Sequence, residues 1–127
     1  KIFKDKSCFH FELGDLGSNR EGIRKSPGPA SGVAFGKRIA LLEEVIEDRY
    51  LNRPEGAYTT YLFDKGIDKI LKKVGEETAE VIIGAKNPGK EEIIYEGSDL
   101  IYHLLVLFKE KGVRIADIEQ ELGKRYK

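Results

Sequence analysis

Two pairs of acidic residues have the spacing of a metal site. Glu77 and Glu80 are three residues apart, and so are Glu96 and Asp99 in a later segment. Because positions three and four apart share one face of a helix, each pair would present its carboxylates in one direction. Glu76 adds a carboxylate four residues before Glu80. Two such helices packed antiparallel would bring four or five carboxylates together.

Apolar residues surround these acids, which distinguishes them from an ordinary charged surface. An acid-rich helix face is usually solvated, and an isolated ExxE pattern carries little information. Here Glu77 lies on an apolar stripe with Val74 and Val81. Glu96 lies on a second stripe with Ile93. Desolvating a carboxylate is costly and like charges repel, so a cation must offset both effects. We expect Mg²⁺, which prefers hard oxygen ligands and retains waters and phosphates in its shell.

Helical periodicity covers most of the chain after residue 32 and must position these acids. Apolar residues recur every three or four positions in segments that glycine and proline separate. We expect helices over residues 35–51, 67–85, 90–111 and 115–125. The pattern predicts an all-α fold, an antiparallel helical bundle with short connections.

Two local features refine this expectation. Tyr58, Thr59 and Thr60 offer an N-cap for a short helical segment that begins at Tyr61, before a break at Gly66. Gly97 weakens the 90–111 helix by about 1 kcal/mol relative to alanine, which we interpret as a sign of a close approach or a crowded site.

The first 35 residues have a different pattern. Residues 1–11 contain three phenylalanines and predict a short strand, and residues 12–32 have the glycine, serine and proline content of a linker. We therefore expect an N-terminal part over residues 1–35 and a helical domain over residues 36–127. The chain begins at Lys1 and contains no methionine, which predicts a fragment or a processed product.

Composition argues against several classes of protein. The 22 basic and 22 acidic residues give a net charge of zero, unlike a general nucleic-acid-binding protein. No apolar run approaches the roughly 18 residues that a membrane span needs. Cys8 is the one cysteine, so no internal disulfide can form and we expect a cytoplasmic protein.

The segments around the acids also resemble one enzyme family. Residues 73–80 (KVGEETAE), 85–87 (AKN) and 95–103 (YEGSDLIYH) are similar to phosphoribosyl-ATP pyrophosphohydrolase of histidine biosynthesis, one of the all-α, MazG-like nucleotide pyrophosphohydrolases. The EExxE and ExxD patterns mark only that superfamily, whereas KVGEE, AKN and DLIYH narrow the resemblance to this enzyme. The similarity covers roughly residues 38–125.

This resemblance implies a reaction and a set of site residues. The reaction is Mg²⁺-dependent hydrolysis of phosphoribosyl-ATP to phosphoribosyl-AMP and pyrophosphate, and Glu76 is a candidate proton acceptor. The implied metal ligands are Glu77, Glu80, Glu96 and Asp99. The candidate substrate-binding residues are Lys73, Lys86, Asn87, Tyr58, Thr59 and His103. Each lysine has the alternative of a solvated surface charge, and His103 that of a buried histidine bonded to Asp99.

The resemblance further implies a homodimer, since the superfamily generally builds its site where bundles pack together. The sequence supports this independently, because four helices, of which the first and last are short, leave part of the two long apolar stripes uncovered. Two other functions stay open. One is a house-cleaning pyrophosphohydrolase acting on non-standard triphosphates with the same metal site. The other is a non-catalytic helical interaction module.

The N-terminal part resembles a different family. The segment Ser7-Cys8-Phe9 is similar to the last zinc-ligand segment of phosphoribosyl-AMP cyclohydrolase, which many organisms fuse ahead of the pyrophosphohydrolase. Residues 1–15 would then be the end of that domain and residues 16–35 the linker. The other zinc cysteines and the aspartate-rich magnesium motif are absent from this sequence, so we expect no cyclohydrolase activity. The alternative for Cys8 is an inert small hydrophobe.

Overall fold

The computed structural model describes residues 31–126, and the regular structure of that part is entirely helical. The helices are α3 (Ser31–Asn52), α4 (Tyr58–Lys65), α5 (Ile67–Ala85), α6 (Glu91–Glu110) and α7 (Ile115–Arg125). This confirms the all-α fold class. The expected strand, the Cys8 segment and most of the linker lie outside the described residues.

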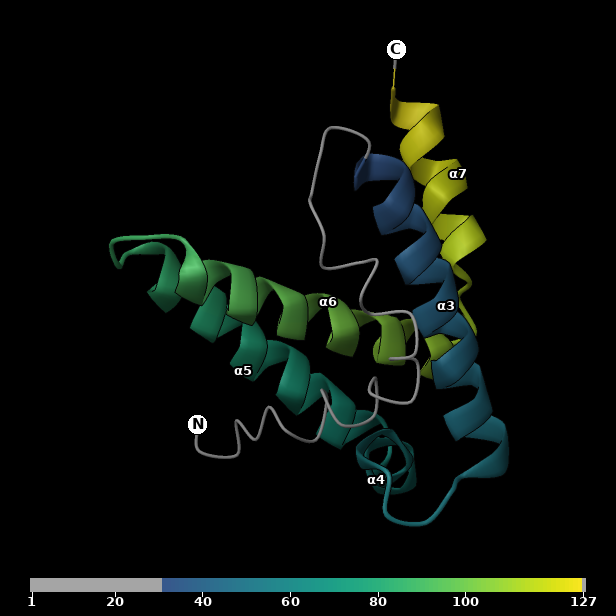
Figure 1. Ribbon diagram of the computed structural model, residues 1–127. Helices are drawn as coiled ribbons and strands as arrows, with labels where there is room; N and C mark the ends of the chain where they lie inside the picture. Colours follow the sequence, from purple (N-terminus) through teal and green to yellow (C-terminus); the bar gives the residue numbers. More distant parts are fainter. Residues whose placement is uncertain (1–30, 127) are drawn as a thin grey trace.

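The helices form two pairs that cross. α5 and α6 make an antiparallel hairpin that projects from the rest of the molecule, while α3 and α7 run steeply across it, with Glu43 of α3 hydrogen-bonded to the start of α7 (Figure 1). α4 lies at the corner between the end of α3 and the start of α5. The most extensive helix contact is between α5 and α6, and α6 also packs on α3. The antiparallel packing that the sequence predicts is therefore found within the hairpin.

The hydrophobic core lies where the two pairs meet. It draws residues from α3, α4, the beginning of α5 and the second half of α6. The buried apolar members are Leu42, Ile46, Leu62, Phe63, Ile70, Tyr102, Leu105 and Val106. The hairpin beyond this crossing has no such core of its own among the described residues, so it depends on α5–α6 contacts.

Most helix boundaries follow the sequence pattern. α5 and α7 have the expected bounds, and α6 is one residue shorter at each end. Gly66 (φ 94°) separates α4 from α5, and Gly112 (φ 74°) follows α6. Both have a positive φ that side chains with a Cβ rarely adopt, which explains why the helices end there.

Two expectations about helix starts were wrong. α3 begins at Ser31 instead of Phe35, so part of the expected linker is helical. α4 begins at Tyr58, and its N-cap Ala57 makes no side-chain cap. Thr59 and Thr60 are therefore not caps but buried residues of the first turn. The Thr59 hydroxyl is instead hydrogen-bonded to the Tyr102 hydroxyl, which explains why it does not cap.

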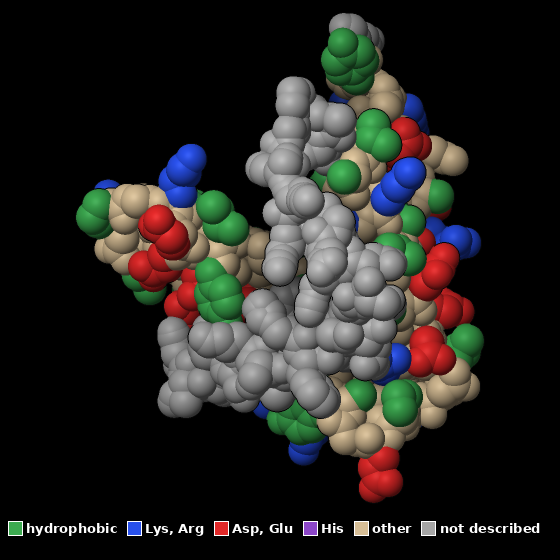
Figure 2. Space-filling view, in the orientation of Figure 1, with side chains coloured by type: hydrophobic (Ala, Val, Ile, Leu, Met, Phe, Trp, Pro, Cys, Tyr) green, Lys and Arg blue, Asp and Glu red, His purple; other side chains and the backbone are tan. Residues whose placement is uncertain are grey.

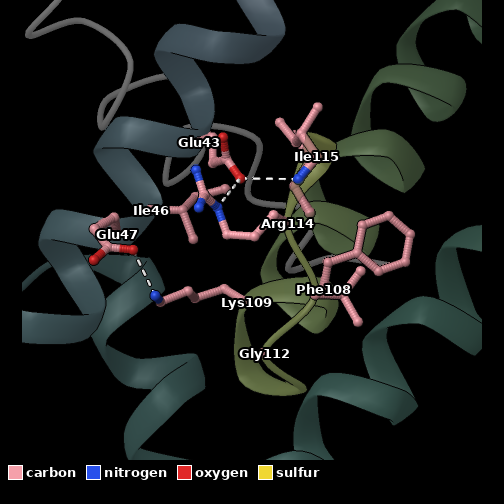
Figure 3. A pocket seen from close by; sticks show the side chains of 10 residues that line it. Glu43, Ile46, Glu47, Phe108, Lys109, Gly112, Arg114 and Ile115 are labelled. Atoms are coloured by element: carbon pink, nitrogen blue, oxygen red, sulfur yellow. Dashed lines mark hydrogen bonds and ion pairs between the residues drawn. The ribbon is translucent and has the colours of Figure 1, made fainter. Parts of the chain in front are cut away.

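Charged contacts around a small pocket hold α7 to α3. Glu43 on α3 accepts a hydrogen bond of 3.0 Å from the backbone N–H of Ile115, and its Oε2 lies 3.6 Å from Arg114 Nε (Figure 3). Lys109 donates to Glu47 at the same pocket. The pocket measures about 90 Å³. Because these charges are paired with one another across it, we interpret the pocket as a helix junction.

Apolar side chains remain exposed on the projecting hairpin. Figure 2 shows apolar and acidic side chains beside one another at its free end. The exposed apolar residues of the two helices are Leu71, Ile82, Ile83, Ile94 and Ile101. These five residues lie outside the predicted stripes, of which Val74, Val81 and Ile93 are half-buried. None of the helices in that part combines the length and apolar content that crossing a membrane requires.

Candidate metal centre

Three of the four predicted acids meet between α5 and α6. One carboxylate oxygen each from Glu77, Glu96 and Asp99 lies within 4.8 Å of the other two. The three residues are only 5%, 6% and 5% exposed, respectively. α5 supplies Glu77 and α6 supplies the other two. This is the convergence expected when two acid-bearing helix faces pack antiparallel.

Close packing near the turn fixes the register of the hairpin. Gly84 is buried, and a Cβ at that position would lie 3.2 Å from Cγ of Glu92. Asn87 Nδ2 donates to Glu92 Oε1 at 2.7 Å. Gly84 and Glu92 each lie seven residues, or about two turns, from Glu77 and Asp99. The same register therefore aligns the acids.

Lys73 brings a positive charge to the cluster. Its Nζ lies 3.6 Å from Glu77 Oε2 and 3.4 Å from Glu76 Oε1. The lysine side chain is 14% exposed and that of Glu76 is 39% exposed, so the pair extends from the cluster to its solvent edge. Among the described residues, three buried carboxylates thus share one neighbouring ammonium. Three hard oxygen donors with net negative charge fit a divalent cation such as Mg²⁺.

His103 lies one turn beyond Asp99 and is held neutral. Its Nδ1 lies 2.8 Å from the backbone oxygen of Asp99, and because a carbonyl only accepts, Nδ1 carries the proton. Nε2 then accepts a hydrogen bond of 2.9 Å from the Tyr58 hydroxyl. The pKa of His103 is lowered from 6.5 to about 4, chiefly by burial and also by the charge of Lys73, against the opposing effects of the Asp99 hydrogen bond and the charge of Glu76.

The remaining predicted site residues lie at three places. Glu80 is half-buried on α5 and is not part of the group of three carboxylates. Lys86 and Asn87 are exposed beyond the end of α5. Tyr58 is half-buried against His103. The structure therefore brings together only part of the predicted set.

Two single residues have surroundings that the sequence pattern does not anticipate. Thr59 has no exposed surface and its hydroxyl is hydrogen-bonded to that of Tyr102, so a role of Thr59 in substrate binding stays a prediction. A Cβ at Gly97 would meet no atom within 4 Å, so nothing in the described chain crowds that position. Sequence reasoning also missed Glu92 and Tyr102, because their partners are set by the packing of helices and not by a local pattern.

Comparison with known protein families shows to which family this chain belongs. Residues 39–126 match the family model described as phosphoribosyl-ATP pyrophosphohydrolase. The chain belongs to the phosphoribosyl-ATP pyrophosphohydrolase family. The matched range contains α4 to α7 and most of α3, and with them the whole carboxylate cluster.

Members of the pyrophosphohydrolase family resemble this chain over different lengths. Phosphoribosyl-ATP pyrophosphatase of Clostridium acetobutylicum is 60% identical over 87 residues, which are 68% of this chain and 79% of that protein. Histidine biosynthesis bifunctional protein HisIE of Thermoanaerobacter pseudethanolicus is 67% identical over 118 residues, or 91% of this chain and 54% of that protein. The protein of the same name from Caldanaerobacter subterraneus is 62% identical over 86 residues, or 68% of this chain and 42% of that protein. The chain spans about half the length of these two bifunctional relatives.

The similarity to the Thermoanaerobacter protein extends beyond the pyrophosphohydrolase domain. An alignment of 118 residues is too long to fit within residues 36–127, so it includes part of the first 35 residues. That residues 1–15 are the end of a cyclohydrolase domain stays a prediction, since they lie outside the described part of the chain.

Proposed function

We propose that this chain hydrolyses phosphoribosyl-ATP to phosphoribosyl-AMP and pyrophosphate, a step of histidine biosynthesis. The observation that supports this most is the convergence of three buried carboxylates from the family's acidic segments. A relative that is 60% identical to this chain over 87 residues is named phosphoribosyl-ATP pyrophosphatase. The bond broken in the reaction joins the α and β phosphorus atoms.

In this proposal the acids of the hairpin hold magnesium. Glu77, Glu96 and Asp99 would be the ligands, and Glu80, half-buried one turn further along α5, would be a fourth. Bound magnesium would screen the phosphate charge, polarise the phosphorus centre and lower the pKa of a water molecule. The burial of the carboxylates supports this role, because excluding bulk water strengthens their interaction with a cation.

Other residues would contact the substrate or accept the proton of the attacking water. Glu76 lies at the solvent edge of the cluster and would accept the proton of the attacking water. Lys73 is close enough to the cluster to meet a phosphate oxygen. Lys86 and Asn87 lie about 14 Å along the helix from Glu77, from nine or ten residues at 1.5 Å each. They would contact the far end of an extended substrate.

We further propose that the active form is a homodimer. The exposed apolar residues of the hairpin would be covered by a second copy, since α5 and α6 leave them open to solvent.

Replacing the ligands tests the site. We expect Asp99→Asn and Glu80→Gln each to lower pyrophosphate release at least about 100-fold, because even partners one step removed from a metal contribute 10- to 100-fold. Glu119→Gln, at an exposed position of α7, is the control and should match wild type. Circular dichroism should show unchanged helix content in all variants. Wild-type rates for both site variants at saturating magnesium would contradict the assignment.

A further inference from the structure

The position of Lys73 is not explained by helix stability. Lys73 precedes Glu77 by four residues, and a lysine in that order contributes less to an isolated helix than the reverse order of glutamate before lysine. The side chain is nevertheless largely buried beside a carboxylate that is itself buried. Holding a lysine in this position removes much of its rotamer freedom. Its charge must therefore act on the cluster.

The charges that face Lys73 come from both helices of the hairpin. Glu76 and Glu77 contact it from α5, and α6 contributes Glu96 and Asp99 to the cluster that Glu77 joins. His103 of α6 adds no charge at neutral pH, because it is held neutral. Among the described residues, these carboxylates outnumber the one ammonium of Lys73.

We propose that Lys73 is a built-in counter-cation that competes with the divalent metal for Glu77 and so sets the metal affinity of the site. This inference rests on the proposed function, since it requires that the cluster binds metal. In the metal-free chain the ammonium reduces the repulsion among the buried carboxylates. A divalent cation at the cluster repels the same ammonium, so binding must displace Lys73 from Glu77.

Glu76 gives the displaced ammonium a second partner. It lies 3.4 Å from Lys73 Nζ, and its side chain is 39% exposed whereas that of Glu77 is 6% exposed. The ammonium can therefore move from the buried carboxylate to the exposed one without leaving the site. At that edge it remains within reach of an anionic substrate.

Metal binding without substrate tests the inference. Titration calorimetry with Mg²⁺ or Mn²⁺ on the metal-free full chain would compare wild type, Lys73→Met, Lys73→Arg and Lys72→Met. A unit charge about 6 Å from a divalent ion changes the affinity for that ion about 10- to 10,000-fold for effective dielectric constants of 80 to 20. We expect Lys73→Met to bind the metal more tightly than wild type, by a factor within that range. Lys73→Arg keeps the charge and should stay near wild type, as should Lys72→Met at an exposed position of the same helix.

The outcomes separate this inference from the proposed function. Equal or weaker binding by Lys73→Met, beside measurable binding by wild type, would overturn the counter-cation role and leave the metal site standing. No binding by wild type would overturn the metal site and this inference with it. In EDTA, the midpoint of urea unfolding should lie at a lower urea concentration for Lys73→Met than for Lys72→Met. If Lys73→Met does not fold, Lys73→Gln carries the same expected result.

Discussion

The hydroxyl of Tyr58 lies 2.9 Å from Nε2 of His103, a hydrogen bond that spans 45 positions of the sequence and joins α4 to α6. The other ring nitrogen of His103 is bonded to the backbone oxygen of Asp99. Two hydrogen bonds through the His103 ring therefore connect Tyr58, the first residue of α4, to the backbone of Asp99, a proposed metal ligand. Thr59 and Tyr102 form a second connection between the same two helices.

Removing the Tyr58 hydroxyl should weaken this connection. Tyr58→Phe leaves Nε2 of the buried His103 without that donor, so we expect a loss of about 1–2 kcal/mol in the free energy of unfolding. Tyr61→Phe, at an exposed position of the same helix, is the matched control, and its free energy of unfolding should fall by a few tenths of a kcal/mol at most. Urea unfolding measures both. Equal stability of the two variants would show that the hydrogen bond contributes nothing.

The low pKa of His103 predicts a pH dependence of stability. Because the folded pKa of about 4 lies below the unfolded value of 6.5, stability from keeping the ring neutral is fully present above pH 6.5 and is lost as pH falls toward 4. In EDTA, the free energy of unfolding of wild type should fall by about 2–3 kcal/mol more than that of His103→Asn between pH 7 and pH 4.5. The variant shares the titration of the carboxylates, so the difference isolates His103. Parallel pH profiles would contradict the buried neutral histidine.

The carboxylate cluster should make the metal-free protein less stable. Glu96→Gln removes one of three buried like charges whose oxygens lie within 4.8 Å, so in EDTA it should raise the free energy of unfolding by roughly 1 to 3 kcal/mol. Magnesium at a thousand times the Kd should reverse the order, because wild type then gains about 4.1 kcal/mol from binding, more than the expected difference. Urea unfolding with and without magnesium measures this. A variant that is less stable than wild type in EDTA would speak against repulsion.

A charge on the exposed hairpin should separate the proposed dimer. Ile94 is 62% exposed in the single chain, so Ile94→Glu should cost a monomer little but should disrupt packing of a second copy on α6. Leu51→Glu, at a similarly exposed position of 64% at the end of α3, is the control. We expect sedimentation to give a monomer for Ile94→Glu and a dimer for wild type and the control. A wild-type monomer with full activity would remove the dimer from the account.

The sequence predicts the helices and the cluster because both follow local rules. The apolar period and the breaks at Gly66 and Gly112 set the bounds of α5 and α6 to within one residue. The three-residue spacing then places Glu96 and Asp99 on one face, opposite Glu77 on the antiparallel partner. Helix geometry places each acid on its face, and the packing of Gly84 against Glu92 sets the two faces in register.

The sequence fails where a partner is remote along the chain. A cap rule applied to Thr59 cannot anticipate a bond to Tyr102, 43 positions away, that draws the hydroxyl into the interior. The steep crossing of α3 and α7 over the hairpin likewise depends on the connections and on the contacts that hold α7, such as that of Glu43 with Ile115. These features decide which predicted residues line the cluster and which support it.

Pyrophosphate release is the measurement that tests the central claim most directly. Phosphoribosyl-ATP, dATP and dUTP would each be offered to the full chain, with magnesium and with EDTA. We predict release from phosphoribosyl-ATP alone, and only with magnesium. Release from dATP or dUTP at comparable rates would keep a metal site but move the protein to the house-cleaning enzymes. No release from any substrate would contradict the account, and would favour a non-catalytic helical module.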